Sequence, residues 1–325
     1  MSPPRSVCGD PSETFQRYAL GLARKDRLPA ETRPDEGRSR REALLLELGR
    51  LGVRGWPLRR TLTTTGVLPD GCRPCLEGRG SSLCLTTRCN RDCFFCFNPK
   101  PRADGMSVHG RPAKTPADAV AILADLDVAS LGISGGEPLL DLDLTLALAR
   151  AVKARFGSAM RIDVYTNGDL LTPSLAGSLR EAGVDGLRVN LAARDYDAAP
   201  VKVALEAGLP AEVEIPVVPG HEARVRRMMD ELDAMGAPHL ILHELFASGQ
   251  NLDALERESL SSKAEDPASS LPWRAVARSE ETAYRLLTHA LRRKLKLSVY
   301  YCSCGTQEWI AESALARARA AEPRR

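Results

Sequence analysis

Three closely spaced cysteines are the residues of this sequence best suited to do chemistry. Cys89, Cys93 and Cys96 lie in the stretch LCLTTRCNRDCFFCFNPK with the spacing C-x3-C-x2-C, and Phe95 directly precedes the last of them. Three thiolates this close together cannot be spread along one strand or one helix face, so they line a loop and converge on one point. The run SLCLTT before them is typical of a short buried strand. The pattern therefore predicts a strand followed by a loop that folds its sulfur atoms around a metal centre.

The number of cysteines in this loop favours an iron–sulfur cluster over zinc. Structural zinc takes four ligands, and no fourth Cys or His lies within the loop. A 4Fe-4S cluster held by three thiolates keeps one iron open for a small molecule, which favours a chemical role over a structural one. The alternative is half of a zinc ribbon that Cys72 and Cys75 complete. Four cations flank the loop, and they either ease reduction of a negatively charged cluster or solubilise the surface: Arg88, Arg91, Lys100 and Arg102.

Two segments together resemble a known superfamily. CNRDCFFC resembles the signature of the radical S-adenosylmethionine (SAM) enzymes, and ISGGEP at 133–138 resembles their glycine–glycine–glutamate–proline segment. The two segments stand in the family's order, about forty residues apart, and the resemblance covers roughly residues 81–246. More narrowly, VYTNG, EIPVVPG, HELFASGQN and SVYYCS are similar to a little-characterised group related to pyruvate formate-lyase activating enzymes.

The resemblance implies both cofactors and a reaction type. It implies a 4Fe-4S cluster on Cys89, Cys93 and Cys96, with SAM chelated by the open iron. It further implies reductive cleavage of SAM to a 5′-deoxyadenosyl radical that takes a hydrogen atom from substrate. A one-electron reductant such as flavodoxin or ferredoxin is the implied partner. The sequence leaves the substrate open, whether a small molecule or a peptide.

The glycine-rich segment is expected to hold SAM. Gly135 and Gly136 lack side chains, so the backbone can approach the methionine part closely. Glu137 can accept a charge-assisted hydrogen bond from its ammonium group, and Pro138 fixes the turn. By family analogy, the backbone at Phe95 contacts the adenine. The side chains expected at the ribose hydroxyls or the carboxylate, all of types that also cap helices and form turns, are Thr166, Asn167 and Asn190.

The rest of the chain alternates between strand and helix patterns. Strands are predicted at 82–87, 130–134, 161–166, 186–191, 212–218 and 239–246. Thr115-Pro116 and Thr172-Pro173 are helix start signals, because a capping hydroxyl precedes a first-turn proline. This alternation predicts an α/β fold of parallel strands with right-handed crossovers. Six such units agree with the family's partial (β/α)6 barrel, in which functional residues gather at the C-terminal ends of the strands.

The composition restricts the partners and the compartment. We divide the chain into a mostly helical N-terminal extension at 1–70, a radical SAM core barrel at 71–250, and a linker with a helix–strand–helix extension at 251–325. A net charge of +3 gives no reason to expect nucleic acid or a membrane as partner. Nine cysteines without an export signal favour metal ligation over disulfides, so we expect a cytoplasmic protein.

Four further cysteines leave two interpretations open. Cys72 and Cys75 form C-x2-C before the first strand, and Cys302 and Cys304 lie one residue apart on a predicted strand near the C-terminus. Residues at i and i+2 of a strand share a face, so the four together are candidates for a second iron–sulfur cluster or a zinc site. Alternatively, Cys302 donates a hydrogen atom to a substrate radical. The alternative functions are a glycyl-radical-enzyme activase and a non-catalytic metal-binding module.

Overall fold

The structure, a computed structural model, describes residues 34–263 and 273–321. An eleven-stranded sheet runs through it, in the order β1-β2-β13-β10-β9-β8-β7-β6-β3-β4-β5. Seven neighbouring strands are parallel: β3 (Gly80–Thr86), β6 (Ser130–Gly135), β7 (Arg161–Thr166), β8 (Gly186–Val189), β9 (Ala211–Val217), β10 (His239–Glu244) and β13 (Ser298–Cys302). The α/β class and the six predicted parallel strands are confirmed.

The strand near the C-terminus is a seventh member of the parallel set. β13 pairs with β10 from His239↔Ser298 to His243↔Cys302. Antiparallel strands extend both edges: β1 (Arg54–Trp56) and β2 (Thr61–Thr63) beyond β13, and β4 (Asp104–Val108) and β5 (Arg111–Ala113) beyond β3. Both predicted extensions therefore share one sheet with the core, and the three-part division stays a prediction. Residues 1–33 of the N-terminal extension lie outside the described residues.

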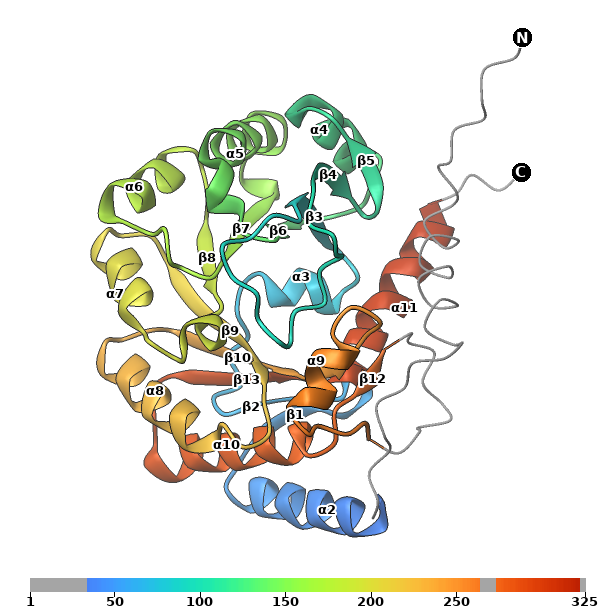
Figure 1. The fold of residues 1–325 in the computed structure, drawn as a ribbon, viewed down its shortest axis with the longest axis vertical. Helices are drawn as coiled ribbons and strands as arrows, with labels where there is room; N and C mark the ends of the chain where they lie inside the picture. Colours follow the sequence, from blue (N-terminus) through green and yellow to red (C-terminus); the bar gives the residue numbers. More distant parts are fainter. Residues whose placement is uncertain (1–33, 264–272, 322–325) are drawn as a thin grey trace.

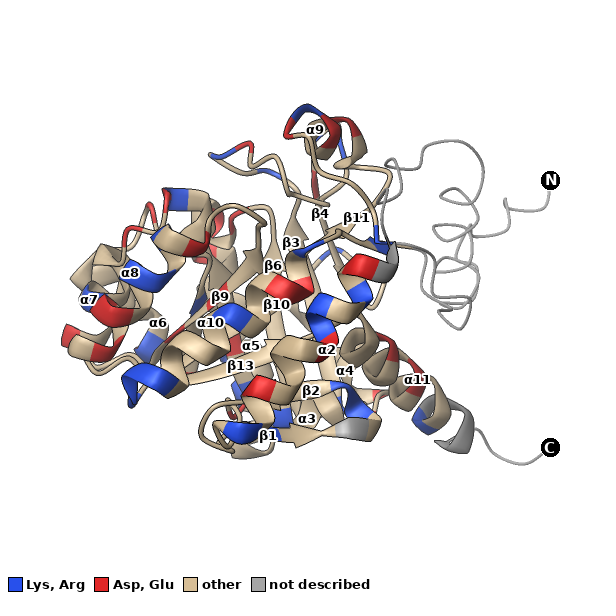
Figure 2. Ribbon diagram, turned by 90° about the horizontal axis from the view of Figure 1, so that it is seen from below, with Lys and Arg blue, Asp and Glu red and all other residues tan. Residues whose placement is uncertain are grey.

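The helices lie on both sides of the curved sheet. They are α2 (Pro34–Arg50), α3 (Cys72–Leu76), α4 (Pro116–Ala124), α5 (Leu142–Phe156), α6 (Pro173–Glu181), α7 (Ala199–Glu206), α8 (Glu222–Ala234), α9 (Leu252–Arg257), α10 (Ser279–Arg293) and α11 (Cys304–Ala321). Figure 1 shows the strands curving around α3, with α4 to α8 and α10 outside. A separate two-stranded antiparallel sheet is formed by β11 (Phe246–Ala247) and β12 (Arg274–Ala275). α9 and β11 lie at the opposite end of the barrel from α3 and β1 (Figure 2).

Both predicted helix start signals are confirmed. Asp118 N donates to the Thr115 hydroxyl at 3.2 Å, and Thr115 N donates to the Asp118 carboxylate at 2.9 Å, which forms a reciprocal capping box. At the second site, Leu175 N donates to the Thr172 hydroxyl at 3.2 Å. In each helix proline occupies the first turn, where its missing N–H costs nothing. These caps fix where α4 and α6 begin and hence the lengths of the connections from the preceding strands.

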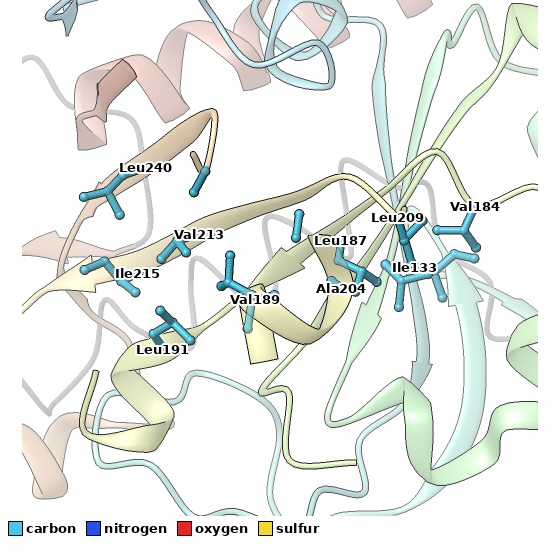
Figure 3. Close-up of a cluster of buried hydrophobic side chains, with 14 of the residues drawn as sticks. Ile133, Val184, Leu187, Val189, Leu191, Ala204, Leu209, Val213, Ile215 and Leu240 are labelled. Atoms are coloured by element: carbon cyan, nitrogen blue, oxygen red, sulfur yellow. The ribbon is translucent and has the colours of Figure 1, made fainter. Parts of the chain in front are cut away.

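Apolar side chains fill the space between the sheet and the outer helices. Figure 3 shows Leu187 and Val189 of β8 beside Val213 and Ile215 of β9, with Ala204 of α7 against them. All five side chains are buried. Burial of this kind stabilises by roughly 25 cal/mol per Å2 of apolar surface and is the main force that holds the helices on the sheet.

The inner face of the sheet is polar where α3 packs against it. Arg188 alternates with Leu187 and Val189 and points inward, where its side chain is 1% exposed. It pairs with Glu212 at 2.9 Å, with Glu214 at 2.9 Å and with Asp163 at 3.7 Å. Its Nη1 also donates to Cys72 Sγ of α3 at 3.4 Å. We call Arg188, its three carboxylate partners and α3 the barrel base, and we call the C-terminal ends of the parallel strands the barrel mouth.

Candidate active site

The three signature cysteines lie together in the loop after β3, at the barrel mouth. This cluster loop runs from 87 to 103, and Cys96 N donates to Cys93 O at 3.0 Å in a turn. Each cysteine is neither fully buried nor fully exposed. Burial, followed by the neighbouring Cys96 and Cys89 thiols, raises the pKa of Cys93 to about 11. Cys89 and Cys96 thus lie near enough to Cys93 to affect its pKa.

The two glycines of GGEP place this segment against the start of the cluster loop. Gly136 N donates to Thr86 O at 2.6 Å, and Glu137 N donates to Arg88 O at 2.8 Å. A Cβ atom on Gly136 would lie 1.8 Å from Arg88 O, and one on Gly135, whose φ is +126°, would lie 2.2 Å from Thr86 O. Only glycine fits either position. The sequence linked these glycines to SAM, and the structure adds that they let two backbone segments of the chain meet.

The Glu137 carboxylate joins the ends of β6 and β7. It accepts hydrogen bonds from Leu139 N at 3.0 Å, from the Thr166 hydroxyl at 2.8 Å and from Asn167 N at 2.7 Å. Burial raises the pKa of Glu137, and these hydrogen bonds oppose that shift. Because the residue is fully buried, its carboxylate holds the strand ends in position in this conformation. Direct contact between this carboxylate and the SAM ammonium group stays a prediction.

A carboxylate that sequence reasoning missed anchors one side of the cluster loop. Asp169 accepts from Arg91 Nε at 2.6 Å and Nη2 at 2.8 Å, and from Asn90 Nδ2 at 3.0 Å. Arg194 pairs with the same carboxylate. The hydrogen bonds from Arg91 hold the pKa of Asp169 below its usual range, so the carboxylate is ionised at neutral pH. Asp169 stands two residues after Asn167. In the sequence, its position just after the end of a predicted strand was the only sign of this role.

Two predicted asparagines also lie at this mouth. Asn167 Nδ2 donates to Asn90 Oδ1 at 2.7 Å and approaches Cys89 Sγ at 3.8 Å. Asn190 follows β8, and its backbone N donates to Thr166 O at 2.9 Å. The Asn190 Oδ1 atom is buried and has no hydrogen-bond partner among the described residues. A buried acceptor without a donor is unfavourable, so this atom suits a ligand that brings its own donor.

The four flanking cations differ in their contacts. Arg102 Nη2 donates to Asp92 at 3.1 Å, and against the effect of its burial the nearby Cys89 and Asp92 raise the pKa of Arg102. Lys100 pairs with Asp92 at 2.7 Å, and Arg88 pairs with Asp104 at 2.6 Å. Arg91 reaches Cys89 through its backbone N, which lies 3.4 Å from the sulfur. Arg102 is therefore the flanking cation whose pKa responds most directly to Cys89.

A histidine that the sequence did not single out contacts the cluster loop. The ring centroid of His221 lies 6.4 Å from that of Phe94. Its Nδ1 hydrogen-bonds to the Tyr196 hydroxyl at 2.7 Å. Burial and the nearby Arg224 lower the pKa of His221, which keeps the ring neutral at pH 7. By contrast, His243 has partners on both ring nitrogens, Glu214 at 3.1 Å and Gln307 at 3.3 Å.

The four outer cysteines do not assemble into a zinc site in the described chain. Cys72 and Cys302 pack in one buried cluster with Leu76 and Tyr300. Cys304 begins α11, where its backbone N donates to Glu244 at 2.8 Å. Within 34–263 and 273–321, no three Cys, His, Asp or Glu side chains are arranged to hold a single ion. This disfavours zinc, which holds all its ligands within about 2.3 Å, and it does not bear on a 4Fe-4S cluster, where each thiolate binds a different iron.

Comparison with known proteins identifies the family of the core. Residues 83–208 match the family model of the Radical SAM superfamily, so the chain contains a radical SAM domain. A Methanocaldococcus jannaschii protein named as a candidate glycyl-radical enzyme activating enzyme is 27% identical over 247 residues, which cover 72% of this chain and 63% of the relative. A Synechococcus GTP 3′,8-cyclase is 29% identical over 214 residues, which cover 64% of this chain and 55% of the relative. The chain thus spans between half and two thirds of these relatives' lengths.

Two solved structures match part of the chain. Streptococcus suis SuiB bound to S-adenosylmethionine matches with a TM-score of 0.48 and 16% identity, covering 67% of this chain and 49% of SuiB. The radical S-adenosylmethionine methyltransferase TsrM from Kitasatospora setae matches with a TM-score of 0.42 and 15% identity, covering 74% of this chain and 61% of TsrM. In the part of this chain that the structure describes, no helix is both long and apolar enough to cross a bilayer.

The mouth fits the cofactors of the radical SAM family, a 4Fe-4S cluster and SAM. Cys89, Cys93 and Cys96 lie on one loop there, and the backbone N of Arg91 donates to Cys89 Sγ. Asn190 Oδ1 supplies an unsatisfied acceptor at a strand end. Amide donors beside a thiolate favour its charged, ligating form, and a free acceptor suits a hydroxyl-bearing ligand.

Proposed function

We propose that this protein is a radical SAM enzyme whose cluster loop holds one 4Fe-4S cluster through Cys89, Cys93 and Cys96. The observation that carries the proposal is the juxtaposition of two motifs. The hydrogen bonds from Gly136 to Thr86 and from Glu137 to Arg88 hold GGEP against the strand end that leads into the cysteines. Two motifs from separate parts of the sequence meet at one mouth, where a chelated ligand can reach both.

The chain's own residues have distinct roles in this proposal. Each cysteine binds one iron and leaves the fourth iron open. When bound, the cluster and SAM supply radical chemistry, in which one electron cleaves the sulfonium and the carbon radical produced takes hydrogen from substrate. The Gly135–Pro138 segment and Asn190 orient SAM, with Thr166 and Asn167 beside them. A flavodoxin- or ferredoxin-type protein is the proposed electron donor.

A second candidate function is activation of a glycyl radical enzyme. The name of the Methanocaldococcus jannaschii relative favours it. In that case the hydrogen donor is a glycine of a partner protein. In the first case the hydrogen donor is a substrate, either a small molecule or a peptide.

Anaerobic reconstitution tests the proposal. We expect a brown protein with about four irons per chain that cleaves SAM when reduced. Deuterated candidate substrates should pass deuterium into 5′-deoxyadenosine, whereas an activase should leave a glycyl radical signal on its partner. A colourless, zinc-containing protein would indicate a non-catalytic metal-binding module and would contradict the proposal.

A further inference from the structure

One short segment beyond β10 contacts the cluster loop at three of its residues. The segment covers residues 246–251 and includes β11, more than 140 residues away from the loop in sequence. The contacts are a hydrogen bond from Asn251 Nδ2 to Phe95 O at 3.0 Å, one from Lys100 N to Gln250 Oε1 at 3.3 Å, and a ring contact between Phe246 and Phe97 with centroids 5.2 Å apart. The loop is therefore held on this side as well as on the Asp169 side.

The amide group of Asn251 has one possible orientation. Its Oδ1 accepts from Ser248 N at 2.8 Å, and a backbone N–H can only donate. Its Nδ2 must then face the two carbonyl oxygens, Phe95 O at 3.0 Å and Phe246 O at 3.2 Å. Both amide hydrogens are used, and the residue is 2% exposed. Asn251 is therefore a buried polar side chain with both amide groups hydrogen-bonded. Its bond to Phe95 O joins residues that are 156 positions apart in the sequence.

The carbonyl that Asn251 holds stands in the middle of the ligand motif. Phe95 immediately precedes Cys96, and its ring is buried against Val218, Leu245 and Leu255. Without Asn251, the Phe95 carbonyl would lose its donor in a site where a lost hydrogen bond is costly. A carbonyl oxygen has two lone pairs, so the bond from Asn251 leaves one for a ligand.

We propose that Asn251 is a positioning residue that fixes the Phe95 carbonyl and, through it, the Cys96 ligand and the surface that receives the adenine of SAM. The inference rests on the proposed function, because it assigns the loop a bound cluster. It is specific to Asn251, whose Nδ2 is the donor to that carbonyl.

Three variants isolate the donor. N251D keeps the shape and the acceptor for Ser248 N but removes both amide hydrogens. N251A removes the group altogether. S248A is the matched control, because it alters the same turn and leaves both the Ser248 backbone donor and the Phe95 contact in place. For each reconstituted protein, we would measure the rate of iron loss to a chelator, the Kd for SAM and the change in the cluster EPR signal when SAM is added. The fold of each apoprotein is checked by circular dichroism.

We expect N251D and N251A to lose iron faster and to bind SAM more weakly than the parent, each by about ten-fold. We also expect an altered EPR response to SAM, with S248A behaving like the parent. Parent-like iron retention and SAM affinity in both variants would overturn the inference. So would collapse of both apoproteins, because that would give Asn251 a general role in folding. The parent's own iron content and SAM binding test the proposed function separately.

Discussion

Two regions of the molecule each contain three neighbouring cysteines: the cluster loop at the barrel mouth, and the interior of the barrel, where Cys72 and Cys75 of α3 lie near Cys302 of β13. Cys89, Cys93 and Cys96 stand on a partly exposed loop, and the backbone N of Arg91 donates to Cys89 Sγ. At the base, burial raises the pKa of Cys72 to about 12 and that of Cys75 to about 11, and it raises the pKa of Cys302 well above the ordinary value. At the mouth, burial likewise raises the pKa of Cys93 to about 11. Burial alone therefore does not separate the two sets. They differ in position, because one lies on a loop after a strand end and the other packs inside the barrel with Leu76 and Tyr300.

The two regions also use charge differently. At the mouth, the charges lie on the cluster loop, where the Asp169 carboxylate holds Arg91. At the base, the charges face one another, since Arg188 is enclosed by three carboxylates. The first arrangement positions a loop that can bind a cofactor. The second is a buried charge network that holds α3 inside the barrel.

The largest expected difference is in iron binding. Replacing Cys89, Cys93 and Cys96 together by Ala should remove about four irons per chain and abolish SAM cleavage. Replacing Cys72, Cys75 and Cys302 by Ala should leave iron content unchanged, because their thiols are packed in the base. Iron analysis after anaerobic reconstitution measures both. If iron or zinc persists in the first variant and disappears when Cys72 is also replaced, the protein has a second metal site that includes Cys72.

The next largest effect concerns the base charges. Arg188→Met should destabilise the fold by about 3–5 kcal/mol, because three buried carboxylates lose their common partner. Arg161→Met is the control, since that side chain is 21% exposed and also pairs with the surface residue Asp70. Denaturant unfolding of the apoproteins gives both free energies. Equal losses in the two variants would show that burial does not set the energy of the base network.

A variant of Glu137 can distinguish a role in positioning the strand ends from direct contact with SAM. Glu137→Gln places an amide hydrogen against backbone and hydroxyl donors, so it should cost about 1–3 kcal/mol of stability and weaken SAM binding about ten-fold. The cluster spectrum should remain, because Glu137 does not bind iron. Glu181→Gln, at the exposed end of α6, is the control. Calorimetric SAM titration and unfolding of the apoprotein distinguish the roles, since weaker binding at unchanged stability would indicate direct contact alone.

The smallest effect is a pH dependence at the base. Burial, opposed by Arg188, raises the pKa of Glu212 to about 7 from an ordinary 4.5. A raised carboxyl pKa means that the protonated form stabilises the fold below pH 4.5 and that this stability is lost as pH rises through 7. Glu212→Gln keeps a neutral side chain, so it should gain on the order of 1 kcal/mol over the parent at pH 8 and nothing at pH 4.5. A constant difference between the two proteins from pH 4.5 to pH 8 would contradict this assignment.

The sequence by itself determined the features that depend on nearby residues. The cysteine spacing, the GGEP segment, the six parallel strands and the caps at Thr115 and Thr172 are all local patterns of residue type and period. Each is set within about one element by backbone geometry, capping or hydrophobic alternation, so it can be interpreted without knowing the fold.

Only the tertiary structure decided what lies beside the cluster loop and what fills the barrel. Asp169 and Asn251 reach the loop from 78 and 156 residues away, and β13 joins the sheet next to β10. The same folding buried Cys72 and Cys302 together, although their spacing suggested ligands. Contacts between residues so far apart leave no periodic signal in the sequence, because either partner alone is also compatible with an ordinary turn, cap or buried side chain.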